Sequence, residues 1–259
     1  MVTARITDGR WPNVILPALG AFLVLALWEI AVRVGLVTDI VAASPTEIFQ
    51  YLANEIMQGG PLVGDLLSTL QSFVIGVGLA AVIAVPVGFA SAWFRSVEYA
   101  ISPFVWVFYN TPKIAFYPLF IIAVGLGKPT IVLICFLFAL FPLYDAGFTA
   151  VRQANDLTVM AARAFGASDL TLMRKVILPS SVPVLAAGLR LGMGHGLVGV
   201  IVGELFGSDS GLGFRMNEAA STLDVTTYFG CLFVVMAIGV ASSEGLRFVE
   251  HRTSRWRPN

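Results

Sequence analysis

The sequence predicts an all-α integral membrane protein, formed by one domain over residues 1–259. Hydrophobic residues make up 57% of the 259 residues and charged residues only 12%, whereas soluble domains are about 45–50% apolar and about 25% charged. The apolar residues also gather in runs that can cross a bilayer, which takes about 20 helical residues. The formal net charge is zero and no basic face is visible, so we expect no nucleic-acid partner.

Six apolar runs are long enough to span a membrane. They cover residues 14–37, 66–94, 101–125, 130–151, 179–206 and 226–249. Pro103, Pro112 and Pro118 interrupt the third run, which predicts a broken or kinked span and leaves a count of five open. Cys135 and Cys231 lie inside spans, and we expect them to be core residues rather than a disulfide.

A short helix is expected between the first two spans. Ser44 and Glu47 match a capping box, with Pro45 at the first helical position. We therefore expect a helix that lies on the outer surface of the membrane. At the end of the first span, the spacing of Glu29 and Arg33 predicts a local ion pair.

The distribution of positive charge orients the spans. One side carries Arg5, Arg10, Arg95, Arg152, Arg163, Arg174, Lys175, Arg247, Arg252, Arg255 and Arg257. The other side carries Arg33, Lys128 and Arg215. Because cytoplasmic loops of membrane proteins are rich in Lys and Arg, we expect a multi-pass protein with both termini in the cytoplasm.

The longest internal cytoplasmic stretch, residues 152–178, is expected to form two short helices around a glycine. Gly166 can supply the left-handed turn that ends the first helix. Ser168 can cap the second helix, and Asp169 lies favourably in its first turn. Pro179 then begins the fifth span. The pattern predicts a rigid helical loop that projects from the membrane.

The residues of this loop follow a family pattern. They are Met160, Ala161 and Ala162, then Gly166 followed by Ala167, then Val176, Leu178 and Pro179. Their spacing resembles the EAA loop in permease subunits of type I ATP-binding-cassette (ABC) importers, which reads Glu-Ala-Ala, three residues, Gly, nine residues, Ile-x-Leu-Pro. Met160 replaces the usual glutamate, and Val176 replaces isoleucine. Shorter motifs at 44–48, 111–115, 188–191 and 211–214 are similar to the nitrate, sulfonate and taurine branch.

The resemblance implies a set of partners. Two ABC ATPase subunits would dock on the loops of two permease subunits, which we expect to be a homodimer. An extracytoplasmic substrate-binding protein would deliver the solute, and the lipid bilayer of a bacterial inner membrane would surround the spans. The ATPase partner would bind the ATP, so no cofactor is expected in this chain.

The chain has no recognisable catalytic motif of its own. Its only Gly-Lys pair, Gly127-Lys128, is followed by Pro129 and does not fit a phosphate-binding loop. His195 and His251 are the only histidines, and they do not form a zinc-binding H-E-x-x-H motif. We therefore expect a transport subunit rather than an enzyme.

The fifth span combines small residues with ionisable ones. Its glycines recur at four-residue intervals, at positions 188, 192 and 196 and again at 199, 203 and 207. This spacing allows close helix packing, and a pore-lining role is equally compatible with it.

Arg190, His195 and Glu204 of the fifth span are candidates for the translocation path, since ionisable groups are costly at membrane depth. Arg190 and Glu204 share one helix face, about 21 Å apart along the axis, and we expect both to face the pore or the subunit interface. His195 lies about 140° around the helix from Arg190, which favours a hydrogen bond to a neighbouring helix. A pairing of Arg190 with Asp145 is the structural alternative.

The predicted function is the movement of a small solute, anionic or heterocyclic, into the cytoplasm with energy from a separate ATPase. The alternative is an ion-coupled secondary transporter. In that case a carboxylate such as Glu204 or Asp145 would bind the coupling ion.

Overall fold

The computed structural model describes residues 12–38, 40–154 and 156–253, and every regular element within these ranges is helical. The predicted all-α class is therefore confirmed. Four of the basic residues used for the charge-based orientation, Arg5, Arg10, Arg255 and Arg257, lie outside the described residues.

Within the described ranges, five helices are long and apolar enough to cross a membrane, and a bent pair provides the sixth candidate. The five are α1 (Pro12–Arg33), α3 (Pro61–Trp93), α6 (Lys128–Arg152), α9 (Leu178–Gly207) and α11 (Val225–Thr253). Each overlaps most of one of the runs predicted from the sequence, although α1 ends four residues before the first run does and α3 begins five residues before the second.

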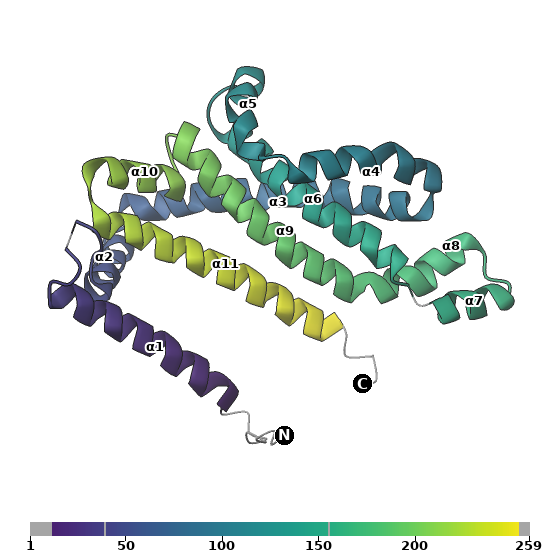
Figure 1. Cartoon of the computed structure of the whole chain (residues 1–259), viewed down its shortest axis with the longest axis horizontal. Coiled ribbons are helices and arrows are strands. Elements are labelled where there is room, and N and C mark those ends of the chain that lie inside the picture. Colours follow the sequence, from purple (N-terminus) through teal and green to yellow (C-terminus); the bar gives the residue numbers. More distant parts are fainter. Residues whose placement is uncertain (1–11, 39, 155, 254–259) are drawn as a thin grey trace.

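The third predicted span is broken, as its prolines indicate. It consists of α4 (Arg95–Asn110), the 3-10 turn η1 (Lys113–Phe116) and α5 (Tyr117–Val124), with a bend of 93° between the two halves. Thr111 is extended, with φ −82° and ψ 137°, because the residue before a proline is pushed out of the helical region. In Figure 1, α5 stands away from the other helices at the top of the view.

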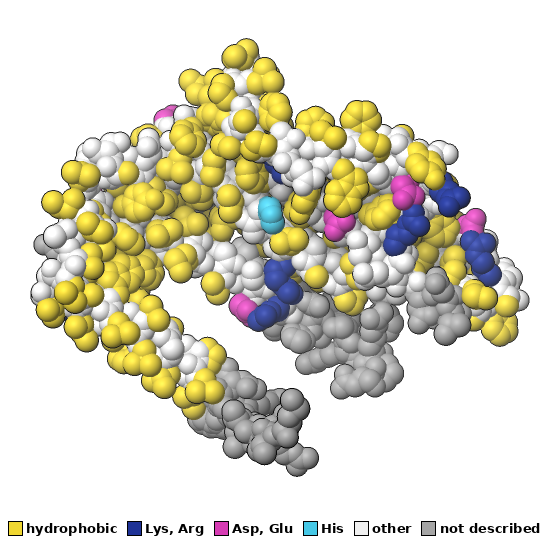
Figure 2. Space-filling model, in the orientation of Figure 1, with side chains coloured by type: hydrophobic (Ala, Val, Ile, Leu, Met, Phe, Trp, Pro, Cys, Tyr) yellow, Lys and Arg dark blue, Asp and Glu magenta, His cyan; other side chains and the backbone are white. Residues whose placement is uncertain are grey.

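The connecting helices lie at opposite ends of the bundle. In Figure 1, α2 (Pro45–Met57) and α10 (Leu212–Thr222) lie at the left end, and α7 (Asp156–Ala164) and α8 (Asp169–Leu172) lie at the right end. The described part of α1 begins, and α11 ends, toward the α7–α8 end. Of these connecting helices, α10 has no counterpart among the elements predicted from the sequence. Hydrophobic side chains cover most of the face seen in Figure 2, and many of its charged side chains lie toward the α7–α8 end.

The predicted elements at the end of α1 are both confirmed. Ser44 accepts a hydrogen bond from the amide of Glu47, and the Glu47 carboxylate accepts one from the amide of Ser44, which forms the capping box of α2. Arg33 Nε lies 2.5 Å from Glu29 Oε1. The Glu29 carboxylate also accepts hydrogen bonds from the amide and hydroxyl of Thr46, so it ties α1 to the start of α2.

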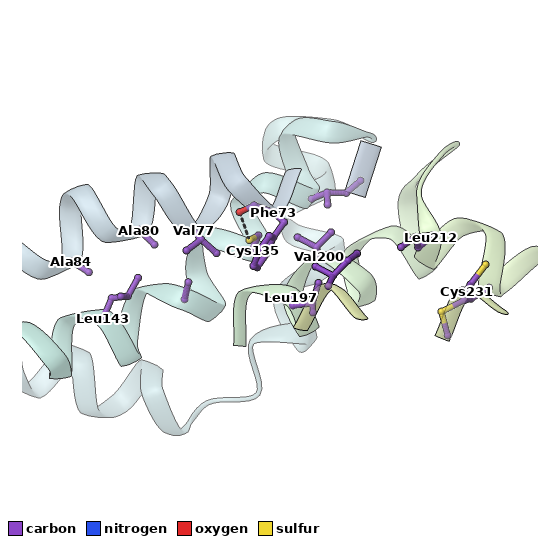
Figure 3. Packing of buried hydrophobic residues seen from close by; sticks show 14 of the residues in the cluster. Phe73, Val77, Ala80, Ala84, Cys135, Leu143, Leu197, Val200, Leu212 and Cys231 are labelled. Atoms are coloured by element: carbon purple, nitrogen blue, oxygen red, sulfur yellow. Dashed lines mark hydrogen bonds between the residues drawn. The ribbon is translucent and has the colours of Figure 1, made fainter. Parts of the chain in front are cut away.

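The core lies between α3, α6 and α9 and extends to α10 and α11. The side chains labelled in Figure 3 are Phe73, Val77, Ala80 and Ala84 of α3, Cys135 and Leu143 of α6, Leu197 and Val200 of α9, Leu212 of α10 and Cys231 of α11. Cys135 and Cys231 are free and fully buried, as predicted. The thiol of Cys135 donates to the carbonyl of Phe73 at 3.7 Å, which links α6 to α3.

The glycines of α9 pack against α3 and α6. A Cβ placed on Gly192 would lie 2.8 Å from Leu143 Cγ, and one on Gly196 would lie 2.6 Å from Val77 Cγ2. A Cβ on Gly199 would lie 3.0 Å from Phe138 Cβ. This face of α9 is therefore closed by neighbouring helices, and of the two compatible roles the structure favours packing.

The contact between α3 and α6 is closer still, because glycines of each helix pack directly against the main-chain atoms of the other. We expect Gly88→Ala to lower the free energy of unfolding by about 1–3 kcal/mol, since its Cβ would lie 2.8 Å from the amide nitrogen of Phe148 and would force the helices apart. Thermal unfolding of the purified chain in detergent measures the effect. Gly78→Ala, on the same helix with open space around its Cβ, is the control and should change stability by no more than about 0.5 kcal/mol. Equal melting temperatures for the two variants would contradict this account.

Candidate functional site

The loop between α6 and α9 has the predicted helix, turn and helix. Gly166 ends α7 with φ +79°, in the left-handed region that glycine enters without strain. The Ser168 hydroxyl accepts from the amide of Thr171 and caps α8. Arg163 and Asp169 form an ion pair of 3.1 Å across the turn. The turn between the two helices is thus formed by a left-handed glycine, a helix cap and an exposed ion pair.

The second half of the loop differs from the prediction in one respect. The helix that starts at Asp169 does not end before Pro179 but continues through a π-helical segment, η2 (Met173–Ile177), into α9. The amide of Leu178 donates to the carbonyl of Met173, five residues back. A wider turn at this point is compatible with Pro179, which has no N–H and whose ring would clash with a carbonyl four residues back.

The loop presents hydrophobic side chains to its surroundings. Met160 is 67% exposed, Phe165 92% and Leu170 61%. Two others anchor the loop to the bundle, since Leu172 is 1% exposed and Ile177 3%. The remaining predicted loop residues divide into exposed and half-buried positions. Ala161, Gly166 and Leu178 are exposed, whereas Ala162, Ala167, Val176 and Pro179 are half-buried.

Arg190 and His195 contribute to the same surface feature of the structure. Both line a shallow groove on α9, together with Ala187, Leu191, Gly194 and Val198, and Phe138 of α6 forms its other wall. His195 Nδ1 lies 3.0 Å from the carbonyl oxygen of Leu191. The histidine thus bonds within its own helix, and the expected hydrogen bond to a neighbouring helix is wrong. Asp145, the alternative partner of Arg190, lines a different pocket between α4 and α6.

Glu204 occupies a different environment from Arg190. It is 1% exposed, and both its carboxylate oxygens lie 2.9 Å from the hydroxyl of Thr69 on α3. One of them also accepts from the amide of Gly213 at 2.9 Å. The side chain is enclosed by α3 and α10 and reaches no open surface of the chain, whereas the sequence analysis expected it to face the pore or the subunit interface.

Glu204 belongs to a polar cluster that caps α10. The amide of Gly211 donates to Asp65, the amide of Leu212 donates to Thr69, and the amide of Gly213 donates to Glu204. Three side chains thus satisfy three of the main-chain donors that a helix N-terminus leaves open. Arg215 Nε lies 2.5 Å from Asp65 Oδ2 and balances the charge of that carboxylate.

Asp65, Thr69 and Arg215 of this cluster, and Lys113 in the third span, were not predicted as functional residues from the sequence. The available signal was the presence of ionisable residues at or near membrane depth. Asp65, at the start of the second span, and Lys113, in the third, carry the same signal as the ionisable residues of the fifth.

A bundle of five to six candidate membrane spans, with a helical loop projecting from one end, is the architecture of a multi-pass membrane protein and is compatible with a permease. The match to a family model supports this class: residues 84–255 match the binding-protein-dependent transport system inner membrane component. This chain belongs to that family, the permease subunits of ABC importers.

Individual relatives agree with this assignment. A protein of Brucella abortus named as an ABC transporter permease is 30% identical over 89% of this chain and 90% of its own length. SsuC of Bacillus subtilis, named for the transport of aliphatic sulfonates, is 26% identical over 96% of this chain and 88% of its own length. The fold is similar to that of an inward-facing structure of the MetNI methionine ABC transporter, with a TM-score of 0.67 and 20% identity over 78% of this chain and 99% of that one.

The cap of α10 leads to a stability prediction. Glu204→Ala leaves the Gly213 amide and the Thr69 hydroxyl without their shared acceptor, and each unsatisfied buried group costs about 1–3 kcal/mol. We expect a clear drop in the unfolding temperature in detergent and faster hydrogen exchange at the amide of Gly213. Glu244→Ala is the control, because it removes only an exposed ion pair with Arg247 and should have little effect. A Glu204→Ala chain as stable as this control would show that the cap is dispensable.

Proposed function

We propose that this chain moves a small anionic or heterocyclic solute into the cytoplasm as one half of a permease homodimer. Two ABC ATPase subunits supply the energy, and an extracytoplasmic binding protein delivers the solute. The chain itself contributes conformational change, and ATP hydrolysis takes place in the ATPase subunits.

The observation that carries this proposal is the α7–α8 loop. Its helices are held by Gly166 and by the Arg163–Asp169 ion pair, while Met160, Phe165 and Leu170 project outward. A rigid element with exposed hydrophobic side chains is suited to docking in a groove on another protein. We assign the ATPase as that protein, on the EAA spacing and on family membership.

We place the α7–α8 end in the cytoplasm. The basic residues Arg95, Arg152, Arg174 and Lys175 belong to the turns at this end, which agrees with the positive-inside rule. The described start of α1 and end of α11 lie toward the same end, so both termini are assigned to the cytoplasm of a bacterial inner-membrane protein. The capped helices α2 and α10 then face the binding protein.

Two observations support an anionic solute: the groove between α9 and Phe138 of α6, and the name of one relative. The groove places the cationic side chain of Arg190 among apolar residues, and SsuC is named for the transport of sulfonates. The alternative of an ion-coupled secondary transporter would need a carboxylate available to an ion, whereas Glu204 is occupied by the cap of α10. Ion-gradient uptake by the purified chain alone in liposomes would favour that alternative, and uptake that requires the ATPase would exclude it.

The first functional prediction concerns the coupling loop. In Gly166→Val, a β-branched residue would have to adopt φ +79°, at a cost of about 1–2 kcal/mol, and the loop would distort. We expect ATPase binding to weaken by about tenfold, measured by co-purification and titration in nanodiscs. Gly59→Val imposes the same kind of strain at the opposite end of the bundle, where φ is +63°, and should leave ATPase binding unchanged. Normal binding and coupled ATP hydrolysis in Gly166→Val would contradict the assignment.

The second functional prediction concerns Arg190. If it serves the solute, Arg190→Ala should lower solute uptake by about tenfold, the loss of one charge-assisted contact, while the dimer and its ATPase still assemble. Size-exclusion chromatography and uptake into proteoliposomes separate the two effects. Arg247→Ala, which removes an exposed charge near the end of α11, should retain uptake. An Arg190→Ala chain that fails to assemble would instead show a structural role.

A further inference from the structure

Lys113 lies at the break between the two halves of the third span and is surrounded by aromatic rings. Its Nζ lies 5.5 Å from the ring centre of Tyr109, 5.7 Å from that of Phe138 and 5.0 Å from that of Phe141. It also donates a hydrogen bond to the main-chain oxygen of Tyr109 at 3.2 Å. The side chain is half-buried, so its charge is held partly away from water among apolar neighbours.

Phe138 connects Lys113 to the groove on α9. The Lys113 ammonium lies 5.7 Å from the centre of the Phe138 ring. Phe138 also lines the groove that contains Arg190 and His195. The three nitrogen-bearing side chains come from separate parts of the chain, the break of the third span and two positions on α9. Lys113 does not line the groove itself; Phe138 is the residue that it shares with Arg190 and His195. We call the groove, together with Lys113 beyond Phe138, the basic groove.

We propose that the basic groove binds the anionic group of the transported solute, a sulfonate or a carboxylate, with Lys113 as a binding residue. The inference rests on the proposed import function and narrows its solute to an anion. It also assigns Lys113 a role that composition and spacing did not suggest.

The electrostatics of Lys113 support this assignment. A cation at membrane depth is costly, and the rings and one carbonyl compensate it only in part, because an ammonium has three donors. Among the described residues, no carboxylate oxygen lies within 4.0 Å of its Nζ as an ion-pair partner. An arriving anion would supply the missing partner.

The break in the helix supports it as well. The 93° bend between α4 and α5 interrupts the span immediately before Lys113. Discontinuous helices in transporters commonly form solute sites near the middle of the membrane. The break thus places a charged side chain and irregular main chain at the same depth.

Two carboxylates lie near the aromatic residues that surround Lys113, in a separate pocket. Asp145 and Glu98 line the pocket between α4 and α6, next to Tyr109 and Phe141. Glu98 is paired with Arg152 at 2.5 Å. The carboxylate of Asp145 would oppose tight binding of an anion, and a transport site must hold its cargo weakly enough to release it. If this acidic pocket dominated the local electrostatic potential, the site would favour cations over anions. The experiment below distinguishes a negative from a positive potential in the groove.

The test uses a cysteine as a probe of local charge in the full-length chain in nanodiscs. Val198→Cys places a thiol in the groove, where the native side chain is 54% exposed. Its rate of modification is measured with two methanethiosulfonate reagents, one bearing a sulfonate and one a trimethylammonium group. Met57→Cys, at a position 84% exposed on α2, is the control, and the native Cys135 and Cys231 are buried.

We expect the sulfonate reagent to be favoured over the ammonium reagent by about tenfold more at Val198→Cys than at Met57→Cys. This preference should disappear when Lys113→Gln is added, persist with Lys113→Arg, and persist with Lys128→Gln as a matched control. Millimolar ethanesulfonate should slow the modification, and only when position 113 is basic.

Several results would overturn the inference. They are a preference for the ammonium reagent, a groove that neither reagent reaches, or a preference that Lys113→Gln leaves unchanged. None of these results bears on ATPase docking, which is measured with Gly166→Val. The cysteine experiment can therefore contradict the solute site without contradicting the importer function. The importer function would be contradicted separately, if the chain did not bind the ATPase.

Discussion

Close main-chain contact between α3, α6 and α9 is the constraint on which the rest of the structure depends. In lipid, helices gain little from burying apolar surface, so close packing of small residues has to hold the bundle together. Gly88 on α3 and Gly147 on α6 each face the main chain of the opposite helix. On α9, Gly192 faces a side chain of α6 and Gly196 faces a side chain of α3. The α7–α8 loop, the groove of Arg190 and the cap of α10 are all connected to these three helices.

The polar residues of the bundle follow from a second constraint, the need to satisfy main-chain donors away from water. A short helix such as α10, inserted between two spans, begins with open N–H groups, and Asp65, Thr69 and Glu204 accept from them. A carboxylate in a span can therefore serve the fold rather than the cargo. Lys113 differs, because its partners are aromatic rings and one carbonyl, and a cation in such surroundings remains able to bind an anion.

Much of this fold could be predicted from the sequence, because apolar runs, prolines and capping residues act locally. The spans, the break near Pro112, the cap at Ser44 and the turn at Gly166 all come from interactions within a few residues. Contacts between distant segments could not be predicted in this way. One helical wheel put Glu204 on the same face as Arg190 and His195 on another, yet packing encloses Glu204 and brings His195 into the groove of Arg190. The rotation of each helix against its neighbours is not visible in one sequence.

The continuity of α8, η2 and α9 has a mechanical consequence. The helix runs unbroken over 39 residues from Asp169 to Gly207, a length of about 58 Å at 1.5 Å per residue. A tilt of α9 by a few degrees would become a displacement of several ångströms at its far end, where Glu204 holds α10. Arg190 lies near the middle of this rod. A movement of the α7–α8 loop would thus reach the groove of Arg190 and the cap of α10 through one helix, and the π turn at Met173–Ile177 is the point where that helix can bend.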